Sequence, residues 1–363
     1  MTDKIKKTDL ENLGFNEFFE SEWKQVEFPG SLIARVVAEY KEEYRVRRKD
    51  EELKAKVTGR QMFRAENRAD YPAVGDWVVI SEAEKKSLVI RHILPRQTIL
   101  KKKYSDKLNT QIIATNIDTA FIVESMDGDY NLNRFERYLV LAKEGGIDAV
   151  IVINKADLLS EQELNERIDQ IWKRFPGIKT IVTSAVTGHG INELTSVIGR
   201  GKTYCFLGSS GVGKSSLINK LLGTEVIRTG EISHSSGKGT HTTTTRQMYF
   251  LKNGGILIDN PGTREVGITE AGRGIEKIFD EITALSGRCK FSDCNHMREP
   301  GCEVQKAVKN KELDEEKYQN YMRLKKESDH YEMTSLDKRV KDRRFGRFVK
   351  KAKFQSKKFK SGK

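Results

Sequence analysis

Residues 154–157 (NKAD) and residues 208–215 (GSSGVGKS) decide the fold of this chain, because of the order in which they occur. The second stretch has the pattern G-x-x-x-x-G-K-[ST], in which glycines let successive backbone N–H groups converge on phosphate oxygens. The first has the pattern N-K-x-D, which reads guanine, and residues 259–262 (DNPG) add the D-x-x-G pattern that senses a γ-phosphate. In most domains with these three motifs the phosphate-binding loop comes first. The order here predicts a circularly permuted domain that binds GTP and GDP.

The phosphate-binding loop stands in the local context that its chemistry requires. A strand is expected over residues 203–207 and a helix over residues 216–222, so the loop would lie at a helix N-terminus that attracts phosphate. Lys214 is expected to bridge the β- and γ-phosphates, and Ser215 is expected to coordinate Mg²⁺. The other residues expected to hold the phosphates are Gly208, Ser209, Ser210, Gly211, Val212, Gly213 and Ser216.

The guanine-reading motif follows an apolar strand expected over residues 149–153. The Asp157 carboxylate can accept hydrogen bonds from both N1–H and the 2-amino group of guanine. Adenine lacks this donor pair and would leave a partly buried carboxylate unpaired, which is costly. Asn154 is expected to contact the base edge or the neighbouring loops, and the Lys155 stem to cover the base face. The loop expected to close on guanine from the other side contains Thr183, Ser184 and Ala185.

The γ-phosphate side of the site is expected between residues 237 and 262. Asp259 follows an apolar strand and is expected to hold Mg²⁺ through water, and the Gly262 N–H would face the γ-phosphate. Thr244 and Thr245 are both candidates for the threonine that ligates Mg²⁺ in the GTP state, and the sequence does not separate them.

The catalytic step is the least determined part of the site. Thr263 occupies the position at which Ras-type enzymes carry the glutamine that orients the attacking water. Intrinsic hydrolysis is therefore expected to be slow unless another group or a partner assists. His241 is the candidate substitute, and a solvent-exposed loop position is the alternative for it. The expected catalytic set is His241, Lys214 and Gly262.

Three cysteines and one histidine lie close together in the sequence, as Cys289-x4-Cys294-x-His296-x5-Cys302. Three thiolates and one imidazole can fill the four positions of a tetrahedral Zn²⁺ site. Four protein ligands leave no position for a catalytic water, so one structural zinc ion per chain is expected, with free surface thiols as the alternative. The remaining cysteine, Cys205, lies in an apolar strand, where we expect a small buried hydrophobe.

Three patterns of apolar residues divide the 363-residue chain, which is long enough for two or three domains. Short β-type runs between residues 31 and 94 predict a small barrel, for which an OB-fold is the natural expectation. From residue 116 strands alternate with helices, which predicts a parallel sheet with helices on both faces. The expected parts are a lead-in at residues 1–28, an all-β OB-fold barrel at 29–98, an α/β circularly permuted P-loop domain at 99–268, a mostly helical zinc-binding domain at 269–335 and a basic tail at 336–363.

The net charge of +13 is concentrated near the end of the sequence. Residues 338–363 contain 13 Lys and Arg and one acid, Asp342, so the rest of the chain is close to neutral. A basic segment of this density is typical of proteins that bind nucleic acid. Four phenylalanines between the charges could stack on bases, so RNA binding is favoured over a merely solvated end. They are Phe345, Phe348, Phe354 and Phe359.

The sequence contains no run of about 18 apolar residues, and its first ten residues are polar. Neither a transmembrane helix nor a secretory signal is therefore expected. Four cysteines without a secretion signal indicate a reducing compartment. We expect a cytoplasmic monomer without a membrane partner.

These features together resemble those of the RsgA family of ribosome small subunit-dependent GTPases, also called YjeQ. The resemblance covers roughly residues 30–330 and rests on residues 72–78 (PAVGDWV), the permuted motif order, residues 239–244 (GTHTTT) and the Cys/His cluster. It implies an OB-fold, a permuted GTPase domain and a zinc domain. It also implies GTP hydrolysis stimulated by the small (30S) ribosomal subunit, rRNA binding, and a role beside other assembly factors in late subunit maturation. The histidine proposed as catalytic in the family would correspond to His241.

Two departures and two other functions accompany this resemblance. Asn260 replaces the threonine of the usual D-T-P-G motif, and the segment after Lys326 lies outside the matching region. The other functions are an RNA-binding assembly protein whose GTP site turns over little, and a P-loop ATPase. Because Gly262 leads within tens of residues to the Cys/His cluster, we hypothesise that the nucleotide state repositions the zinc-binding part. The rRNA contacts, the order of action among assembly factors and regulation by ppGpp are not determined by the sequence.

Overall fold

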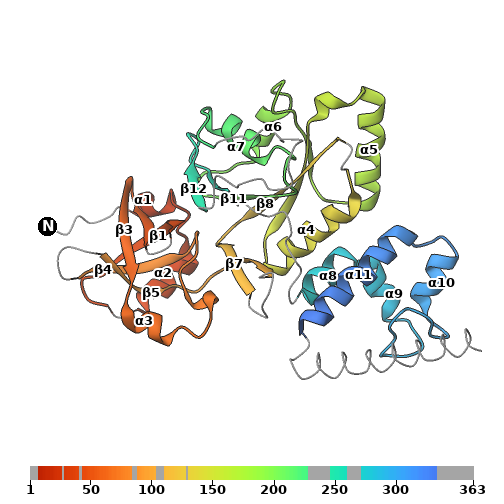
Figure 1. The fold of residues 1–363 in the computed structure, drawn as a ribbon, viewed down its shortest axis with the longest axis horizontal. Coiled ribbons are helices and arrows are strands. Elements are labelled where there is room, and N and C mark those ends of the chain that lie inside the picture. The colour runs from red at the N-terminus through yellow and green to blue at the C-terminus, as the bar shows by residue number, and fades with distance from the viewer. Residues whose placement is uncertain are drawn as a thin grey trace, which may run out of the picture.

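The computed structural model describes residues 7–26, 28–40, 43–83, 88–103, 110–127, 130–227, 246–259 and 271–332. Within them a β-barrel, a central sheet covered by helices and a C-terminal group of helices follow one another in space (Figure 1). The predicted basic tail and four residues with predicted roles at the nucleotide lie outside the described residues. These four are His241, Thr244, Thr245 and Gly262.

The N-terminal strands close into a five-stranded barrel in the order β1-β2-β3-β5-β4, because β4 pairs back to β1. Strand β3 runs parallel to β5, and the other pairs are antiparallel. This arrangement confirms the predicted OB-fold barrel. The elements of this part are α1 (Lys7–Glu11), α2 (Glu17–Lys24), β1 (Leu32–Glu39), β2 (Tyr44–Arg48), β3 (Glu51–Val57), α3 (Gly59–Arg64), the 3-10 turn η1 (Arg68–Asp70), β4 (Trp77–Glu82) and β5 (Leu88–Ile93).

Two apolar clusters stabilise the barrel. One fills its interior and includes Val36, Val46 and Ile90, which are fully buried. The other lies between the barrel and the N-terminal helices, where the rings of Phe15 and Trp77 meet edge to face with 4.8 Å between their centroids. Trp77 is 0% exposed, so its indole belongs to the core of this part.

The central part contains a mostly parallel sheet in the order β10-β9-β8-β11-β13-β12. Its parallel strands agree with the predicted α/β domain, but β12 runs antiparallel to β13. Only the short stretch of residues 251–255 joins β12 to β13, and a parallel pair would need a crossover of about a dozen residues or more. The strands are β8 (Thr119–Ser125), β9 (Asp148–Asn154), β10 (Thr180–Val182), β11 (Thr203–Leu207), β12 (Gln247–Phe250) and β13 (Ile256–Asp259).

Helices cover both faces of this sheet, as predicted (Figure 1). Successive residues of a strand point to opposite faces, so Phe121 joins one apolar cluster and Ile122 the other. Helices α4 and α5 contribute to the cluster that contains Ile122, and α6 and α7 contribute to the cluster that contains Phe121. The helices are α4 (Leu132–Glu144), α5 (Glu161–Arg174), α6 (Ile191–Ser196) and α7 (Lys214–Leu222).

Two features lie at the junction of the barrel and the central sheet, and the sequence pattern predicts neither of them. A hairpin of β6 (Ile99–Lys103) and β7 (Thr110–Thr115) lies between the two parts of the chain. Strand β1 also pairs with β12, with Ala38 opposite Gln247. The barrel and the central strands therefore form one continuous 11-stranded sheet.

The turn before β4 fits closely against the end of β7. Gly75 has a φ of +103°, and a Cβ atom there would overlap the carbonyl oxygen of Thr115. The next residue, Asp76, is fully buried and accepts a hydrogen bond from the Thr115 hydroxyl at 2.6 Å. Asp76 also forms an ion pair with Arg96 at 2.7 Å. The PAVGDWV segment therefore fixes the barrel against the hairpin.

A buried arginine crosses the same junction. Arg35 donates hydrogen bonds to the carbonyl oxygens of Leu13, at 2.5 Å, and Asn116, at 3.0 Å. Burial lowers the pKa of Arg35 to about 10, and the nearby carboxylates of Asp118 and Asp76 oppose this shift. The guanidinium therefore stays charged at neutral pH and links the N-terminal segment, the barrel and the chain that enters β8.

The C-terminal helices share an apolar cluster with the central sheet, because Val304 and Leu324 belong to the cluster that contains Ile122. The first helical stretch of this part, residues 272–286, is divided into two helices. The chain turns at Phe279, whose ring is fully buried beside Tyr321, and this burial favours the break. The helices are α8 (Gly272–Ile278), α9 (Asp280–Ser286), α10 (Glu303–Lys309) and α11 (Glu315–Glu332).

Among the described residues, none of the helices combines the length and the apolar character that crossing a membrane requires.

Gly75→Ala is expected to lower the free energy of unfolding by about 2 kcal/mol or more, because it adds left-handed strain and a backbone overlap. Gly59→Ala is the matched control in the barrel, since open space surrounds Gly59 and its φ is not positive. The control is expected to change stability by less than about 1 kcal/mol. Equal denaturation midpoints for the two variants in urea would refute the proposed role of the close contact.

Candidate functional site

The phosphate-binding loop lies where parallel strand β11 ends and helix α7 begins. The carboxyl ends of parallel strands are the usual ligand edge of such a sheet. Gly213, directly before α7, has a φ of +93°, and a Cβ atom there would overlap the Asn154 side chain. Glycine at this position therefore allows the loop to approach the guanine-reading motif.

Lys214 is the first residue of α7, and its ammonium group folds back over the loop. Its Nζ donates hydrogen bonds to the carbonyl oxygens of Gly208 and Ser209, at 2.8 and 2.5 Å. The positive charge thus lies above the loop, at the N-terminal end of a nine-residue helix whose dipole also favours an anion. Both features suit a site for phosphate.

The guanine-reading motif and the 183–185 loop meet at the ends of β9 and β10. The Ser184 hydroxyl donates to the Asp157 carboxylate at 2.5 Å, and the Thr183 hydroxyl donates to Asn154 Oδ1 at 3.1 Å. Lys155 adopts a left-handed conformation, with φ of +60°, which turns the chain sharply after β9. The predicted residues of both loops are thus adjacent.

Asn154 connects this guanine side to the phosphate side. Its Nδ2 donates to the carbonyl oxygen of Val212 at 2.8 Å, and the residue is 1% exposed. Of the two expectations for Asn154, the contact with neighbouring loops is therefore the one observed. The structure brings together all the predicted guanine and phosphate residues that it describes.

Asp259 is the last residue of β13 and is almost fully buried. Because β13 pairs with β11, its carboxyl end lies beside the phosphate-binding loop. This position suits the Mg²⁺ role expected for Asp259. The switch residues expected to complete that side lie outside the described part of the chain.

The sequence reasoning missed a set of charged residues beside the loop. Arg134, from α4, donates to the Ser209 hydroxyl at 3.2 Å and lies 3.7 Å from the buried Glu124 carboxylate. Lys155 forms an ion pair with Asp127 at 2.9 Å. Glu124 and Asp127 stand at the end of β8, between the two strands that carry the motifs. The sequence feature that could have identified this set is the pair of acidic residues at the end of an apolar strand.

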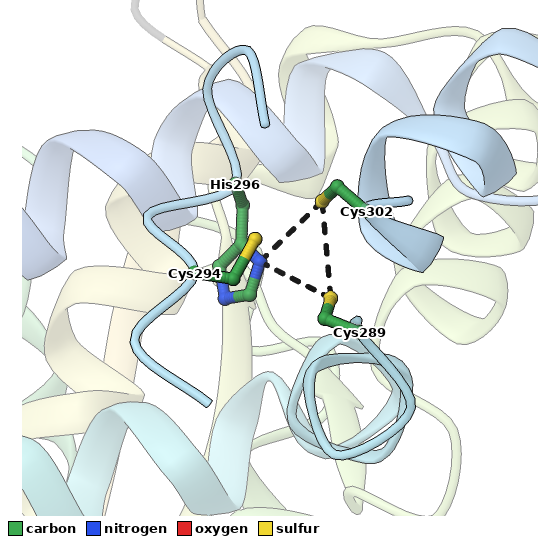
Figure 2. Close-up of side chains that lie close together, drawn as sticks. All are labelled: Cys289, Cys294, His296 and Cys302. Atoms are coloured by element: carbon green, nitrogen blue, oxygen red, sulfur yellow. Dashed lines mark hydrogen bonds between the residues drawn. The ribbon is translucent and has the colours of Figure 1, made fainter. Parts of the chain in front are cut away.

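The four residues of the Cys/His cluster converge, with their potential ligand atoms all within 4.8 Å of one another (Figure 2). Cys289 Sγ lies 3.9 Å from Cys302 Sγ and 3.7 Å from His296 Nδ1, and Cys302 Sγ lies 3.6 Å from the same nitrogen. Tetrahedral zinc with ordinary bond lengths requires about 3.8 Å between sulfurs and about 3.6 Å between sulfur and nitrogen. The donor set and its spacing therefore fit Zn²⁺.

Neighbouring groups orient the histidine of the cluster. His296 Nε2 lies 3.0 Å from the Ser286 hydroxyl, which leaves Nδ1 facing the thiols. The His296 carbonyl oxygen accepts hydrogen bonds from Tyr318, at 2.7 Å, and Gln305, at 2.6 Å. Burial lowers the pKa of His296, and the charge of Lys325 lowers it further. The ring is therefore neutral near pH 7, which is the form that binds a metal.

Comparison with known proteins agrees with this geometry. The family model described as RsgA GTPase matches residues 93–269. The "Small ribosomal subunit biogenesis GTPase RsgA 2" of Lactiplantibacillus plantarum is 40% identical over 319 residues, which cover 87% of this chain and 90% of that protein. A protein of Bacteroides thetaiotaomicron named "Small ribosomal subunit biogenesis GTPase RsgA 1" is 38% identical over 322 residues, covering 88% and 89% of the two chains.

Solved structures show the same architecture. The crystal structure of YjeQ from Thermotoga maritima is 30% identical, with a TM-score of 0.60, over 81% of this chain and 97% of that one. The structure of YloQ, described as a circularly permuted GTPase, has a TM-score of 0.58 over 85% and 99% of the two chains, and at 22% identity it supports the fold alone. The motif order, the three-part fold and these similarities agree, and the chain belongs to the RsgA GTPase family.

Proposed function

We propose that this chain hydrolyses GTP in late maturation of the small ribosomal subunit, and that it binds the rRNA of that subunit. The family is one of GTPases, and its members reported above are named for biogenesis of the small subunit. The observation that carries the proposal is the hydrogen bond between Asn154 and Val212, which joins a guanine-reading motif to a phosphate-binding loop. The P-loop ATPase alternative has no support from these relatives.

Each group at the site has a part in this reaction. We assign base recognition to Asp157, with Ser184 holding the carboxylate in place. We assign phosphate binding to the backbone N–H groups of residues 208–216 and to the Lys214 ammonium. When bound, Mg²⁺ supplies charge neutralisation on the β- and γ-phosphates, and Ser215 and Asp259 are the proposed residues for it.

The residue that activates water cannot be a glutamine directly after the D-x-x-G motif, because Thr263 occupies that position. We propose that His241 orients the water, that Thr244 or Thr245 completes the Mg²⁺ site, and that Gly262 contacts the γ-phosphate. Such a site is expected to be slow alone and to accelerate when a partner orders the switch segment. The small subunit is the proposed partner.

The Cys/His cluster is proposed to hold one structural Zn²⁺. The ion would connect the end of α9, the loop through Cys294 and His296, and the start of α10, which Cys302 caps by accepting a hydrogen bond from the Gln305 N–H. Two large apolar side chains of this loop, Phe291 and Met297, are exposed and so add little to its packing.

Nucleotide state is proposed to reach the C-terminal helices through α8. The Ala271 N–H, at the start of α8, donates to the Ser328 hydroxyl of α11 at 3.1 Å. Helix α4 is also bound to α11, because Arg137 forms two hydrogen bonds with Glu327, at 2.8 and 3.0 Å. A displacement at the start of α8 would therefore act on α11 through Ser328, while α4 holds α11 from another side.

GTP turnover with and without purified small subunits tests the proposed reaction. Strong stimulation by small subunits, and none by large ones, is expected for the unaltered chain. Lys214→Ala is the blank, because it removes the phosphate-binding charge. His241→Ala is expected to lower stimulated turnover by about a hundredfold or more, the usual contribution of a water-positioning group, with GTP affinity nearly unchanged. Tight GTP binding without any stimulation would favour the binding-only alternative.

Asp157→Asn is expected to weaken GTP binding by about tenfold to several hundredfold, since it replaces a charged acceptor by an amide that repels the guanine donors. Binding of a xanthine nucleotide should rise, because xanthine carries a carbonyl in place of the 2-amino group. Asp169→Asn, on the exposed side of α5, is the control. Isothermal titration with both nucleotides measures the change, and an unaltered preference for GTP would exclude Asp157 as the guanine reader.

Metal analysis of the purified chain is expected to find about one zinc per molecule, and Cys302→Ser is expected to lose it. Loss of zinc should also lower the thermal midpoint, because metal binding contributes to folding of the loop. Cys205→Ala is the matched control: Cys205 is fully buried in β11, where burial raises its pKa to about 12. A metal content equal in the two variants would contradict the proposed site.

A further inference from the structure

A cationic pocket of about 340 Å³ lies outside the nucleotide site and the Cys/His cluster. Its walls come from the connection into β6, the last turn of α4 and the first turns of α8. Three parts of the chain therefore meet there: the hairpin beside the barrel, the central domain and the C-terminal helices. Several of the lining residues are exposed, so the pocket opens to solvent.

Among the described residues, five cationic side chains and one carboxylate, Glu144, line this pocket. Arg96 is already neutralised by Asp76, and Lys143 lies 3.4 Å from the exposed Asp148. The others are available for a ligand. Within the described part of the chain, Lys101 and Lys277 have no ion-pair partner.

Arg273 forms only a weak ion pair with Glu144. Its pair with Glu144 is long, at 3.3 Å, and the Arg273 side chain is 79% exposed. A surface pair of this kind contributes about 0–1 kcal/mol, so the guanidinium can turn to a stronger anion. The end of α4 carries a partial negative charge that opposes an anion, but Lys143 lies in that same turn and offsets it.

We propose that this pocket binds backbone phosphate of structured RNA, which rests on the proposed ribosomal function. Sites for small organic ligands are lined mostly by apolar and aromatic side chains, whereas none of the described residues that line this pocket is aromatic. Exposed lysines and an arginine on separate elements are instead typical of contacts to a phosphate backbone. A phosphate between Lys101 and the Lys277 and Arg273 side chains would link the β6–β7 hairpin to α8.

The position of the pocket connects RNA binding to the nucleotide site. Ala271 lines the pocket and follows residues 260–270, which continue from Asp259. RNA held by Arg273 and Lys277 would favour one position of α8, the helix that follows residues 260–270 in the sequence. The pocket thereby supplies a route by which a bound subunit accelerates GTP hydrolysis.

The test compares the full chain with the variant Lys101→Gln/Lys277→Gln, both loaded with a non-hydrolysable GTP analogue. Binding to small ribosomal subunits is measured over a series of KCl concentrations. The control is Lys173→Gln/Lys179→Gln, which removes one exposed lysine of α5 and one directly before the edge strand β10. The pocket variant is expected to bind about tenfold more weakly, and its slope of log K against log salt should fall by about one to two. The control should match the unaltered chain, and unstimulated GTP turnover should be equal in all three.

Three results would overturn the proposal in distinguishable ways. If the pocket variant binds like the unaltered chain while subunits still stimulate that chain, the pocket assignment fails and the proposed function stands. If the unaltered chain neither binds subunits nor responds to them, the proposed function fails and the RNA assignment fails with it. If inorganic phosphate at constant ionic strength stabilises the unaltered chain but not the variant, and both bind subunits equally, the pocket takes free phosphate instead of RNA.

Discussion

The hydrogen bond from the Asn154 side chain to the Val212 carbonyl oxygen is the contact on which the nucleotide site depends. It joins loops from β9 and β11, which are not neighbours in the sheet because β8 lies between them. The contact requires Gly213, since any Cβ at that position would overlap the Asn154 amide. Circular permutation leaves this geometry intact, because the edge at which parallel strands end does not depend on their order in the chain.

Helix α4 lies between the phosphate-binding loop and the C-terminal helices and contacts both. Its apolar face, including Phe135 and Leu139, packs on the central sheet. Its polar residues reach in other directions, with Arg134 toward the phosphate-binding loop and Arg137 toward α11. A single helix thus joins the phosphate-binding loop to the C-terminal helices.

The most buried polar contact of α4 lies at the same interface. Glu136 is 0% exposed, pairs with Arg174 at 2.7 Å and accepts a hydrogen bond from Asn320 of α11. Burial raises the pKa of Glu136, although Arg174 and Asn320 oppose the shift. Arg174 also forms an ion pair with Asp314, at 2.5 Å. Removing one partner of such a buried network lowers the free energy of unfolding by about 3–5 kcal/mol. The network therefore fixes where α11 lies against the central domain.

The sequence by itself determined the parts that depend on local chemistry. These parts are specified by patterns that extend over only a few residues. The patterns are the spacing of glycines, an apolar strand before each motif, and cysteines within one short segment. They predicted the phosphate-binding loop, the guanine reader, the Cys/His cluster, the order of strands and helices, and a barrel at the N-terminus. Tertiary structure alone decided what depends on distant residues. The β1–β12 pairing, the fit of Gly75 to Thr115, the break at Phe279 and the contacts of α4 each join segments whose proximity arises only when the cores are packed. The local sequence pattern cannot predict such contacts, because their energy comes from burial shared between elements far apart in the chain.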